Sequence, residues 1–371
     1  GDCRDELELL PDNSIDSIVT DPPYELGFMG KSWDASGIAY DQRVWVQCLR
    51  VLKPGGHMLA FSGSRTYHRM VCAIEDAGFQ IRDQIMWVYG SGFPKSHNVG
   101  NAIDKKNGAG NRGHAISSGN QLHPTTGLAR PNGEKLDKYE ARTEEGKGWE
   151  GWGTALKPAH EPIALARKPI RGSIKDNVLK HGVGALNIDA TRVGDEILEY
   201  ISNTEKGMYN GAGYAYGDNA DKAYNEIPTT VQGRFPSNVL GDIPDYQKYF
   251  YCPKVSRKER HIGFDIGDER ICAVDAASRQ AVGPGGGKSN PGNNHPTVKP
   301  IELMKYLIKL VTPPGGIVLD PFNGSGSTGC AAVELGCEYV GIELDPAYVE
   351  IANKRIEAWN KDDTNFKELF E

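Results

Sequence analysis

The sequence lacks the features that mark membrane, disulfide-rich and zinc-binding proteins. No apolar run approaches the roughly 20 residues that a bilayer-spanning helix requires, and the start, GDCRDELELL, has no basic-then-apolar signal segment. The seven cysteines are scattered and contain no C-x-x-C pair, so we expect reduced, mostly structural thiols. We therefore expect a cytoplasmic protein with no membrane partner and no bound metal.

The chain also lacks an overall excess of positive charge. Its net charge of −7 argues against a protein that coats nucleic acid nonspecifically. Hydrophobic residues make up 39% and charged residues 25%, which is the composition of a folded globular protein. A chain of 371 residues can hold one large domain with a substantial insertion, or two domains.

Strand-like and helix-like stretches alternate in the first and last parts of the chain. Near the start, a buried strand SIDSIVTD ends at Asp21 and is followed by a helix, DQRVWVQCLRVLK, and a strand, HMLAFS. From Lys299 the order is helix KPIELMKYLIKLV, strand GIVLD, a glycine-rich turn, helix STGCAAVELG and strand EYVGIELD. This alternation predicts two halves of a doubly wound α/β domain around a parallel sheet.

The segment between the two halves has a different composition. Residues 93–294 are rich in Gly, Asn, Pro, Ser and Lys, which predicts a loop-rich, inserted recognition region. Residues 93–180 hold 15 Lys and Arg against 9 Asp and Glu; phosphate contacts would need such a bias, although a solvated surface would show it equally. We therefore divide the chain into residues 1–92, the insertion and its connector at 93–294, and residues 295–371.

The sharpest local feature is Asp21-Pro22-Pro23-Tyr24, which directly follows the first strand. Open α/β sheets bind their ligands at the carboxyl ends of parallel strands. The prolines fix φ and remove N–H donors, so Asp21 and the Pro22 carbonyl can present acceptors on a rigid backbone. Two acceptors suit an exocyclic amine, and Tyr24 offers a ring for an extruded base. A plain turn after a strand is the alternative.

A glycine-rich turn follows the strand that ends at Asp320. Gly324 and Gly326 permit a tight turn and close approach of a ligand. The spacing nearly matches the dinucleotide fingerprint, but Asp320 and Phe322 stand where a pyrophosphate would have to lie. The turn therefore predicts a ligand other than a dinucleotide.

Two further features suit a nucleoside cofactor with a carboxylate at its far end. Glu343 ends the next strand about 20 residues beyond the turn, where an acid can accept hydrogen bonds from both ribose hydroxyls. Thr297 and Lys299, in HPTVKP, stand at the start of a helix and could hold a carboxylate. An exposed acid at a strand end is the alternative for Glu343.

Taken together, DPPY, FNGSG, the acid of GIELD and HPTVKP resemble the amino-methylating DNA methyltransferases. With DPPY first, the cofactor motif last and a long insertion between, the order is similar to the permuted β-class. The resemblance covers about residues 1–90 and 295–360. It implies an α/β, doubly wound, circularly permuted Rossmann-like sheet with a long inserted target-recognition region. It also implies methyl transfer from S-adenosyl-L-methionine to a flipped base in double-stranded DNA.

The resemblance assigns a role to each motif. It makes the DPPY tetrapeptide catalytic. It places Asp2 and Cys3 beside the adenine of the cofactor, in a chain whose two ends lie side by side in the sheet. The strand that the family has directly before Gly1 is absent from this sequence. The cofactor-binding positions expected from motif and resemblance are Asp2, Cys3, Thr297, Lys299, Asp320, Phe322, Gly324, Ser325, Gly326, Thr328 and Glu343.

The motifs leave two possible target bases, adenine and cytosine, each with an exocyclic amine. Asp rather than Ser at position 21 favours adenine N6 over cytosine N4 by resemblance. Methyltransferases of RNA or protein usually resemble an Asn-Pro-Pro version, and a nonmethylating DNA-binding subunit would have no need of Asp21 and Glu343. The family also suggests a homodimer, a cognate restriction enzyme and association with the nucleoid.

Several aromatic residues have less specific surroundings. Trp33 and Asp34 follow the catalytic loop and could contact the flipped base, or could simply pack that loop. Trp149 and Trp152 could stack on bases, although tryptophans more often anchor loops. The segment GWGTALKPAHEPIALARKP is similar to the one that follows the catalytic half in the family.

Overall fold

The computed structural model describes most of both halves and parts of the region between them. The described residues are 1–27, 32–89, 96–109, 140–203, 226–241, 255, 257–264, 292–293, 295 and 297–367. Within them, one sheet has the strand order β7-β3-β4-β2-β1-β8-β9. Its strands are β1 (Ile15–Thr20), β2 (Leu52–Phe61), β3 (Gln80–Val88), β4 (His160–Arg167), β7 (Val239–Gly241), β8 (Ile317–Asp320) and β9 (Glu338–Gly341).

The centre of the sheet is parallel and joins the two ends of the sequence. Strand β1 pairs in parallel with β2 on one side and with β8 on the other, and β8 pairs in parallel with β9. Ser17 lies opposite Val318 and Ile18 opposite Leu319. The carboxyl ends of β1 and β8 are therefore neighbours, as the permuted arrangement requires.

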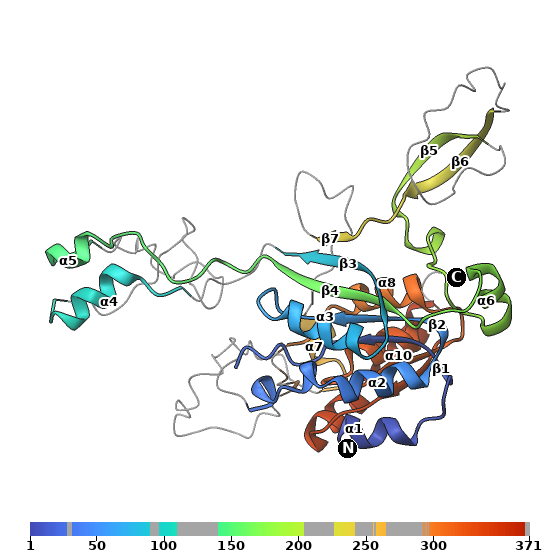
Figure 1. Cartoon of the computed structure of the whole chain (residues 1–371), viewed down its shortest axis with the longest axis horizontal. Coiled ribbons are helices and arrows are strands. Elements are labelled where there is room, and N and C mark those ends of the chain that lie inside the picture. The colour runs from blue at the N-terminus through green and yellow to red at the C-terminus, as the bar shows by residue number, and fades with distance from the viewer. Residues whose placement is uncertain are drawn as a thin grey trace.

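Helices cover both faces of this sheet (Figure 1). Helices α1 (Cys3–Glu6), α2 (Gln42–Val51) and α3 (Tyr67–Asp76) pack on one face, and α8 (Ile301–Val311), α9 (Ser327–Glu334) and α10 (Pro346–Lys367) pack on the other. Strand β2 alternates between the two cores, with Met58 and Ala60 on the first face and Leu59 and Phe61 on the second. Burial on both faces is typical of a doubly wound sheet and confirms the expected fold class.

The boundaries predicted for the insertion need a correction. Strands β4 and β7 come from residues 93–294 but belong to the central sheet, where β4 lies antiparallel between β2 and β3. From Ile163 to Ala166 every residue of β4 is buried. The short apolar run PIALA is typical of a central strand. The loop-rich composition around it, however, indicates a loop region.

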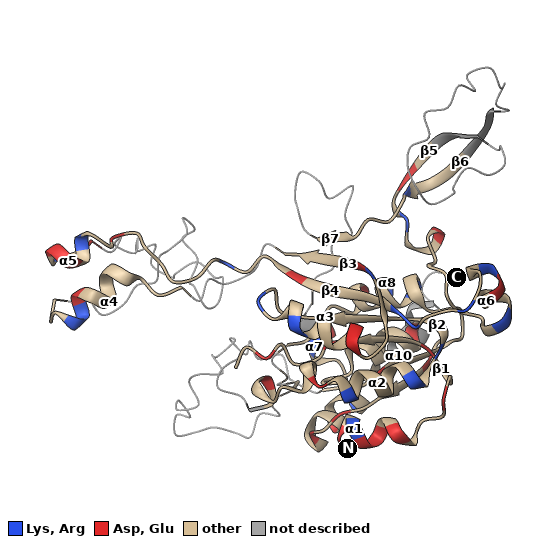
Figure 2. Ribbon diagram, in the orientation of Figure 1, with Lys and Arg blue, Asp and Glu red and all other residues tan. Residues whose placement is uncertain are grey.

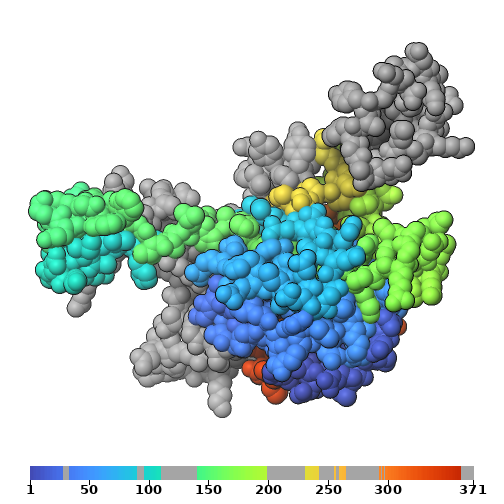
Figure 3. Space-filling model, in the orientation of Figure 1, coloured from blue at the N-terminus to red at the C-terminus, as the bar shows by residue number. Residues whose placement is uncertain are grey.

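Two other parts of the region between the halves project from the sheet (Figure 1). Helices α4 (Val99–Lys106) and α5 (Glu144–Lys147) lie together beyond β3 and β4, and β5 (Val193–Asn203) pairs with β6 (Glu226–Arg234) in an antiparallel hairpin. The space-filling view shows the projection with α4 and α5 standing clear of the body (Figure 3). The remaining described helices are α6 (Ile174–His181), α7 (Arg257–His261) and short 3₁₀ helices at Leu7–Leu9, Ser32–Ala35, Ile38–Tyr40 and Asp189–Thr191.

The start of the chain contacts the end of β9. The amino group of Gly1 donates to the backbone oxygen of Glu343 at 2.9 Å. Gly1 and the last described residues are not side by side in the sheet, however, because α1 begins at Cys3 and the 22-residue helix α10 follows β9. A helix of that length spans about 33 Å, which carries the last described residues away from Gly1.

Two negative findings apply to the described part of the chain. None of its helices is both long enough and apolar enough to cross a bilayer. Its His, Cys, Asp and Glu side chains form no group of three or more that could hold a metal ion.

Candidate active site

A cavity of about 1340 Å³ lies at the carboxyl ends of β1 and β8. Its wall contains the whole DPPY tetrapeptide from the first half of the chain. The same wall contains the turn that starts at Asp320, together with Glu343, from the last half. The pairing of β1 with β8 therefore brings the two motifs into one space, where open α/β sheets bind their ligands.

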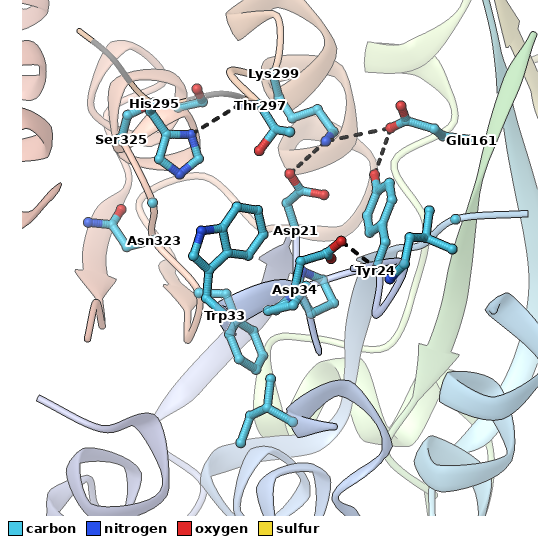
Figure 4. A pocket seen from close by; sticks show the side chains of 18 of the residues that line it. Asp21, Tyr24, Trp33, Asp34, Glu161, His295, Thr297, Lys299, Asn323 and Ser325 are labelled. Atoms are coloured by element: carbon cyan, nitrogen blue, oxygen red, sulfur yellow. Dashed lines mark hydrogen bonds and ion pairs between the residues drawn. The ribbon is translucent and has the colours of Figure 1, made fainter. Parts of the chain in front are cut away.

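Asp21 and Lys299 form a buried ion pair in this cavity. The Lys299 Nζ lies 2.6 Å from Asp21 Oδ2, and Lys299 is only 6% exposed (Figure 4). Burial raises the pKa of Asp21, an effect that the Lys299 ammonium partly offsets. Asp21 Oδ1 is buried and has no hydrogen-bond partner among the described residues. One carboxylate oxygen is thus fixed, while the other remains available as an acceptor.

Glu161, at the start of β4, extends this pair to the Tyr24 ring. The Tyr24 hydroxyl also lies near Asp21, but it donates its single proton to Glu161 Oε2 at 2.7 Å. The same Glu161 oxygen lies 3.5 Å from Lys299 Nζ. The sequence analysis did not single out Glu161, and its only signal was its place at the start of the PIALA run.

The loop after DPPY is held by Asp34. Its carboxylate accepts from the backbone N–H of Glu25 and Leu26, at 3.0 and 3.2 Å. Glu25 has a positive φ of 56°, which such anchoring stabilises in a non-glycine residue. Asp34 thus braces the loop, while Trp33 lines the cavity beside Asp21 (Figure 4).

Asp320 organises the turn after β8. Its Oδ1 accepts from the Thr20 hydroxyl at 2.6 Å and from the Phe322 N–H at 3.0 Å, and its Oδ2 accepts from the Thr328 hydroxyl at 2.6 Å. Burial raises the pKa of Asp320 to about 6. Both Asp320 and Thr328 line the cavity, but their side chains are bonded to each other and shape the turn.

Gly324 and Glu343 form the next part of the wall. The Gly324 N–H donates to Glu343 Oε2 at 2.8 Å, and the Asp345 N–H donates to Oε1 at 2.9 Å. Burial raises the pKa of Glu343. Each carboxylate oxygen keeps a second acceptor site, so these bonds orient Glu343 and leave it able to accept hydroxyl groups.

Ser325 and Gly326, two of the expected ligand contacts, both pack against α10. Ser325 lines the cavity, but its backbone and side-chain oxygens both accept from the buried Arg355 of α10. Gly326 is not among the lining residues, and a Cβ at this position would lie 3.0 Å from the Cβ of Ala352. With φ at 77°, Gly326 lets the turn pack against α10.

The remaining predicted positions also line the cavity. Phe322 packs on Trp45, with ring centroids 6.2 Å apart. Burial raises the pKa of the Cys3 thiol to about 12, while the Arg4 guanidinium lowers the pKa of Asp2 to about 2. Thr297 is exposed at the rim. The structure thus brings every predicted site residue except Gly326 into one cavity.

His295 is a further wall residue, to which the sequence analysis gave no role. Burial lowers its pKa to about 4, so the ring is neutral near pH 7. Its ring meets Tyr348 edge-on at a centroid distance of 4.7 Å, and it stands close to Gly324. The HPTVKP motif therefore contributes a neutral ring to the cavity wall near Gly324.

A doubly covered, mostly parallel sheet with a cavity at its carboxyl edge defines the class of open α/β proteins that bind ligands at this edge. Within that class, the model of the N6_N4_Mtase family, described as DNA methylase, matches residues 15–354, and the chain belongs to this family. It is a site-specific DNA methyltransferase that acts on an exocyclic amine.

Individual relatives agree with this family. The Type II methyltransferase M.HindIII of Haemophilus influenzae is 25% identical over 393 aligned residues, which cover 95% of this chain and 92% of the relative. M2.DpnII of Streptococcus pneumoniae, also a Type II methyltransferase, is 46% identical over 67 residues, 18% of this chain and 25% of the relative.

Two solved structures share a low sequence identity with the chain. The cytosine-N4-specific PvuII DNA methyltransferase is 14% identical with a TM-score of 0.46, and the match covers 98% of this chain and 91% of that one. M1.HpyAVI in complex with SAM is 17% identical with a TM-score of 0.39, and the match covers 96% of each chain.

Proposed function

We propose that this enzyme methylates adenine N6 in duplex DNA. The observation that carries the proposal is the state of Asp21, whose Oδ2 is held by Lys299 while Oδ1 stays buried and open to a donor. An exocyclic amine has two N–H donors, which would meet Asp21 Oδ1 and the Pro22 carbonyl. Such bonds orient the nitrogen lone pair away from Asp21 and across the cavity.

The other end of the cavity fits a nucleoside that carries no phosphate. Glu343 is oriented by two backbone N–H groups and can accept from ribose hydroxyls, and Phe322 offers an apolar ring. The acids Asp320 and Glu343 would repel a pyrophosphate. S-Adenosyl-L-methionine is the cofactor of the reaction, and when bound it supplies an electrophilic methyl group.

The amine of a purine is a weak nucleophile, so positioning and electrostatics must supply most of the rate. Asp21 aligns the nitrogen and stabilises the positive charge that develops on it as the new bond forms. The base must leave the duplex, because its amine is engaged in pairing there. Lys299 lies 5.3 Å from the centre of the Tyr24 ring, so the opposite face of this ring would receive the base.

Mass spectrometry of nucleosides tests the identity of the base. DNA methylated by the purified protein should contain N6-methyladenine, an expectation that rests on Asp rather than Ser at position 21. The alternative within the family is cytosine N4, which the same pair of acceptors could orient. Recovery of N4-methylcytosine without N6-methyladenine would establish this alternative.

Recognition of the DNA sequence is assigned to the region between the two halves. Figure 2 shows both signs of charge on α4 and α5, and residues 96–109 and 140–158 hold five basic and five acidic side chains. The support for DNA contact there therefore comes from two aromatic residues rather than from charge. Trp149 and Trp152 are 46% and 59% exposed, and their rings meet edge-on. Stacking on bases does not require a basic surface.

Two assemblies belong to the same proposal. The Type II methyltransferases among the relatives support a role beside a cognate restriction enzyme. Sequencing of DNA from a methylation-free host that expresses the chain should show one short motif modified throughout. A homodimer is expected, and sedimentation of the purified protein measures it directly.

A further inference from the structure

Lys299 is enclosed by acids and rings rather than open to a ligand. Its Nζ lies 2.6 Å from Asp21 Oδ2 and 3.5 Å from Glu161 Oε2. The same Nζ lies 5.3 Å from the ring centre of Tyr24 and 5.0 Å from that of Phe61. These four groups surround an ammonium whose side chain is 7% exposed. A free cofactor carboxylate would have to displace one of them.

We propose that Lys299 and Glu161 are positioning residues for Asp21 and Tyr24. Lys299 holds Asp21 Oδ2, so that Oδ1 alone faces the target amine. Glu161 holds Lys299 and the Tyr24 hydroxyl with one oxygen, and so joins the acceptor and the stacking ring in one network. The inference rests on the proposed function, in which Asp21 orients the amine.

The network also sets the charge around the target nitrogen. Asp21 and Glu161 carry two negative charges against the one positive charge of Lys299, which leaves a surplus that favours a positive nitrogen. The other titratable groups that face this cluster are Tyr24, Tyr89, Asp320 and His295, whose ring is neutral near pH 7. Only Lys299 among them opposes protonation of Asp21 through its charge.

This arrangement predicts opposite pH effects for the two positioning residues. Asp21 acts as a carboxylate, and because its pKa is raised, activity is lost as the pH falls through that raised value. Loss of Lys299 removes a charge that lowers the pKa of Asp21, so the acidic limb of kcat/KM should move to higher pH. Loss of Glu161 removes a charge that raises this pKa, so the limb should move to lower pH.

The first variant is Lys299→Met, with Lys305→Met as its control. Lys305 lies in α8, which begins two residues after Lys299, and it also contacts two acids, Glu302 and Glu334, but does not line the cavity. Lys299→Met should lower kcat about 100-fold, as expected for loss of a strong charged hydrogen bond. Its calorimetric Kd for S-adenosyl-L-methionine should stay within about threefold of wild type, as should all constants of Lys305→Met.

A different pattern would overturn the proposal. If Lys299 instead holds the cofactor carboxylate, Lys299→Met weakens cofactor binding about tenfold or more and leaves the acidic limb unmoved. The base identified by nucleoside mass spectrometry does not depend on this outcome, so the proposed function can fail or stand separately.

The second variant, Glu161→Gln, keeps the shape and an oxygen that can accept from Tyr24. It should lower kcat about tenfold without a change in cofactor affinity, because Lys299 loses one of its two carboxylates. This variant still tests the positioning role if circular dichroism shows that Lys299→Met is unfolded. Wild-type kcat in Glu161→Gln would contradict the positioning role.

Discussion

The cavity and the arm that projects beside it use polar and aromatic residues in opposite ways. We define the arm as residues 96–109 and 140–158, which include α4 and α5. In the cavity, Lys299 is buried between carboxylates, while in the arm Trp149 and Trp152 face solvent. Chemistry requires charges held in place away from water, whereas recognition of a duplex requires surface that a partner can reach.

The arm keeps its shape with little apolar burial. Asp104 of α4 is fully buried and accepts from Arg142 N–H at 2.8 Å, from Thr143 N–H at 3.1 Å and from the Thr143 hydroxyl at 2.6 Å. At the base of the arm, the Ser96 hydroxyl accepts from the Thr154 N–H at 2.9 Å. Hydrogen bonds to one buried acid thus replace the apolar core that the sheet provides for the cavity.

The two regions meet at the chain that leaves the arm. Residues 154–160 line the cavity and lead directly into β4. The chain that leaves the arm is therefore also part of the cavity wall. The comparison predicts that changes in the cavity alter turnover or cofactor binding, while changes in the arm alter DNA affinity.

The largest effect is expected for Asp21→Ala. Loss of a preorganised group that stabilises developing charge typically lowers kcat by about 10²–10³-fold. Cofactor binding in calorimetry should be retained, since Glu343 and the turn are untouched. The exposed Asp76→Ala, at the end of α3, is the control with wild-type turnover. Near-wild-type methylation by Asp21→Ala would remove the basis of the mechanism.

Glu343→Ala should affect cofactor binding rather than DNA binding. Loss of charged hydrogen bonds to the ribose is expected to raise the Kd for S-adenosyl-L-methionine about 10–100-fold. Calorimetry measures this Kd. Glu338→Ala, at the exposed start of β9, should change nothing. An unchanged affinity of the Glu343 variant would place the ribose elsewhere.

In the arm, Trp152→Ala should lower the affinity for duplex DNA about tenfold, because stacking on a base contributes about 1–3 kcal/mol. The Kd for the cofactor should be unchanged. Fluorescence anisotropy with labelled DNA measures the first effect. Leu179→Ala on α6 removes another exposed apolar side chain, 81% exposed, and should have no effect. Equal DNA affinities of the two variants would show that Trp152 of the arm does not contribute to DNA binding.

The smallest expected effect is a difference in stability between variants of two glycines. Gly326 and Gly151 both have positive φ, but only a Cβ at Gly326 would meet a neighbour, Ala352, while the space around Gly151 is open. Gly326→Ala should lower the free energy of unfolding by about 1–3 kcal/mol more than Gly151→Ala does. Thermal denaturation measures both, and equal losses would show that the turn does not pack tightly on α10.

Much of the architecture was predictable because its signals are local. The strands ending at Asp21 and Asp320 were recognisable from apolar runs followed by turn residues, and the helices between them from their periodicity. The permuted order of the motifs was enough to predict that the two strand ends meet. Strand β4 escaped prediction because a short buried run inside loop-rich sequence has no periodicity of its own.

The sequence by itself determined the fold class, the motif order and the family. Only the tertiary structure decided which atoms those motifs meet. Lys299, predicted to hold a cofactor carboxylate, pairs with Asp21, 278 positions away, and Gly326, predicted at the ligand, packs against Ala352 of α10. Glu161 gains its proposed role from a hydrogen bond to Tyr24 across 137 positions and from its contact with Lys299. Local patterns determine strands and turns, whereas such partners depend on how sheet and helices bring distant side chains together.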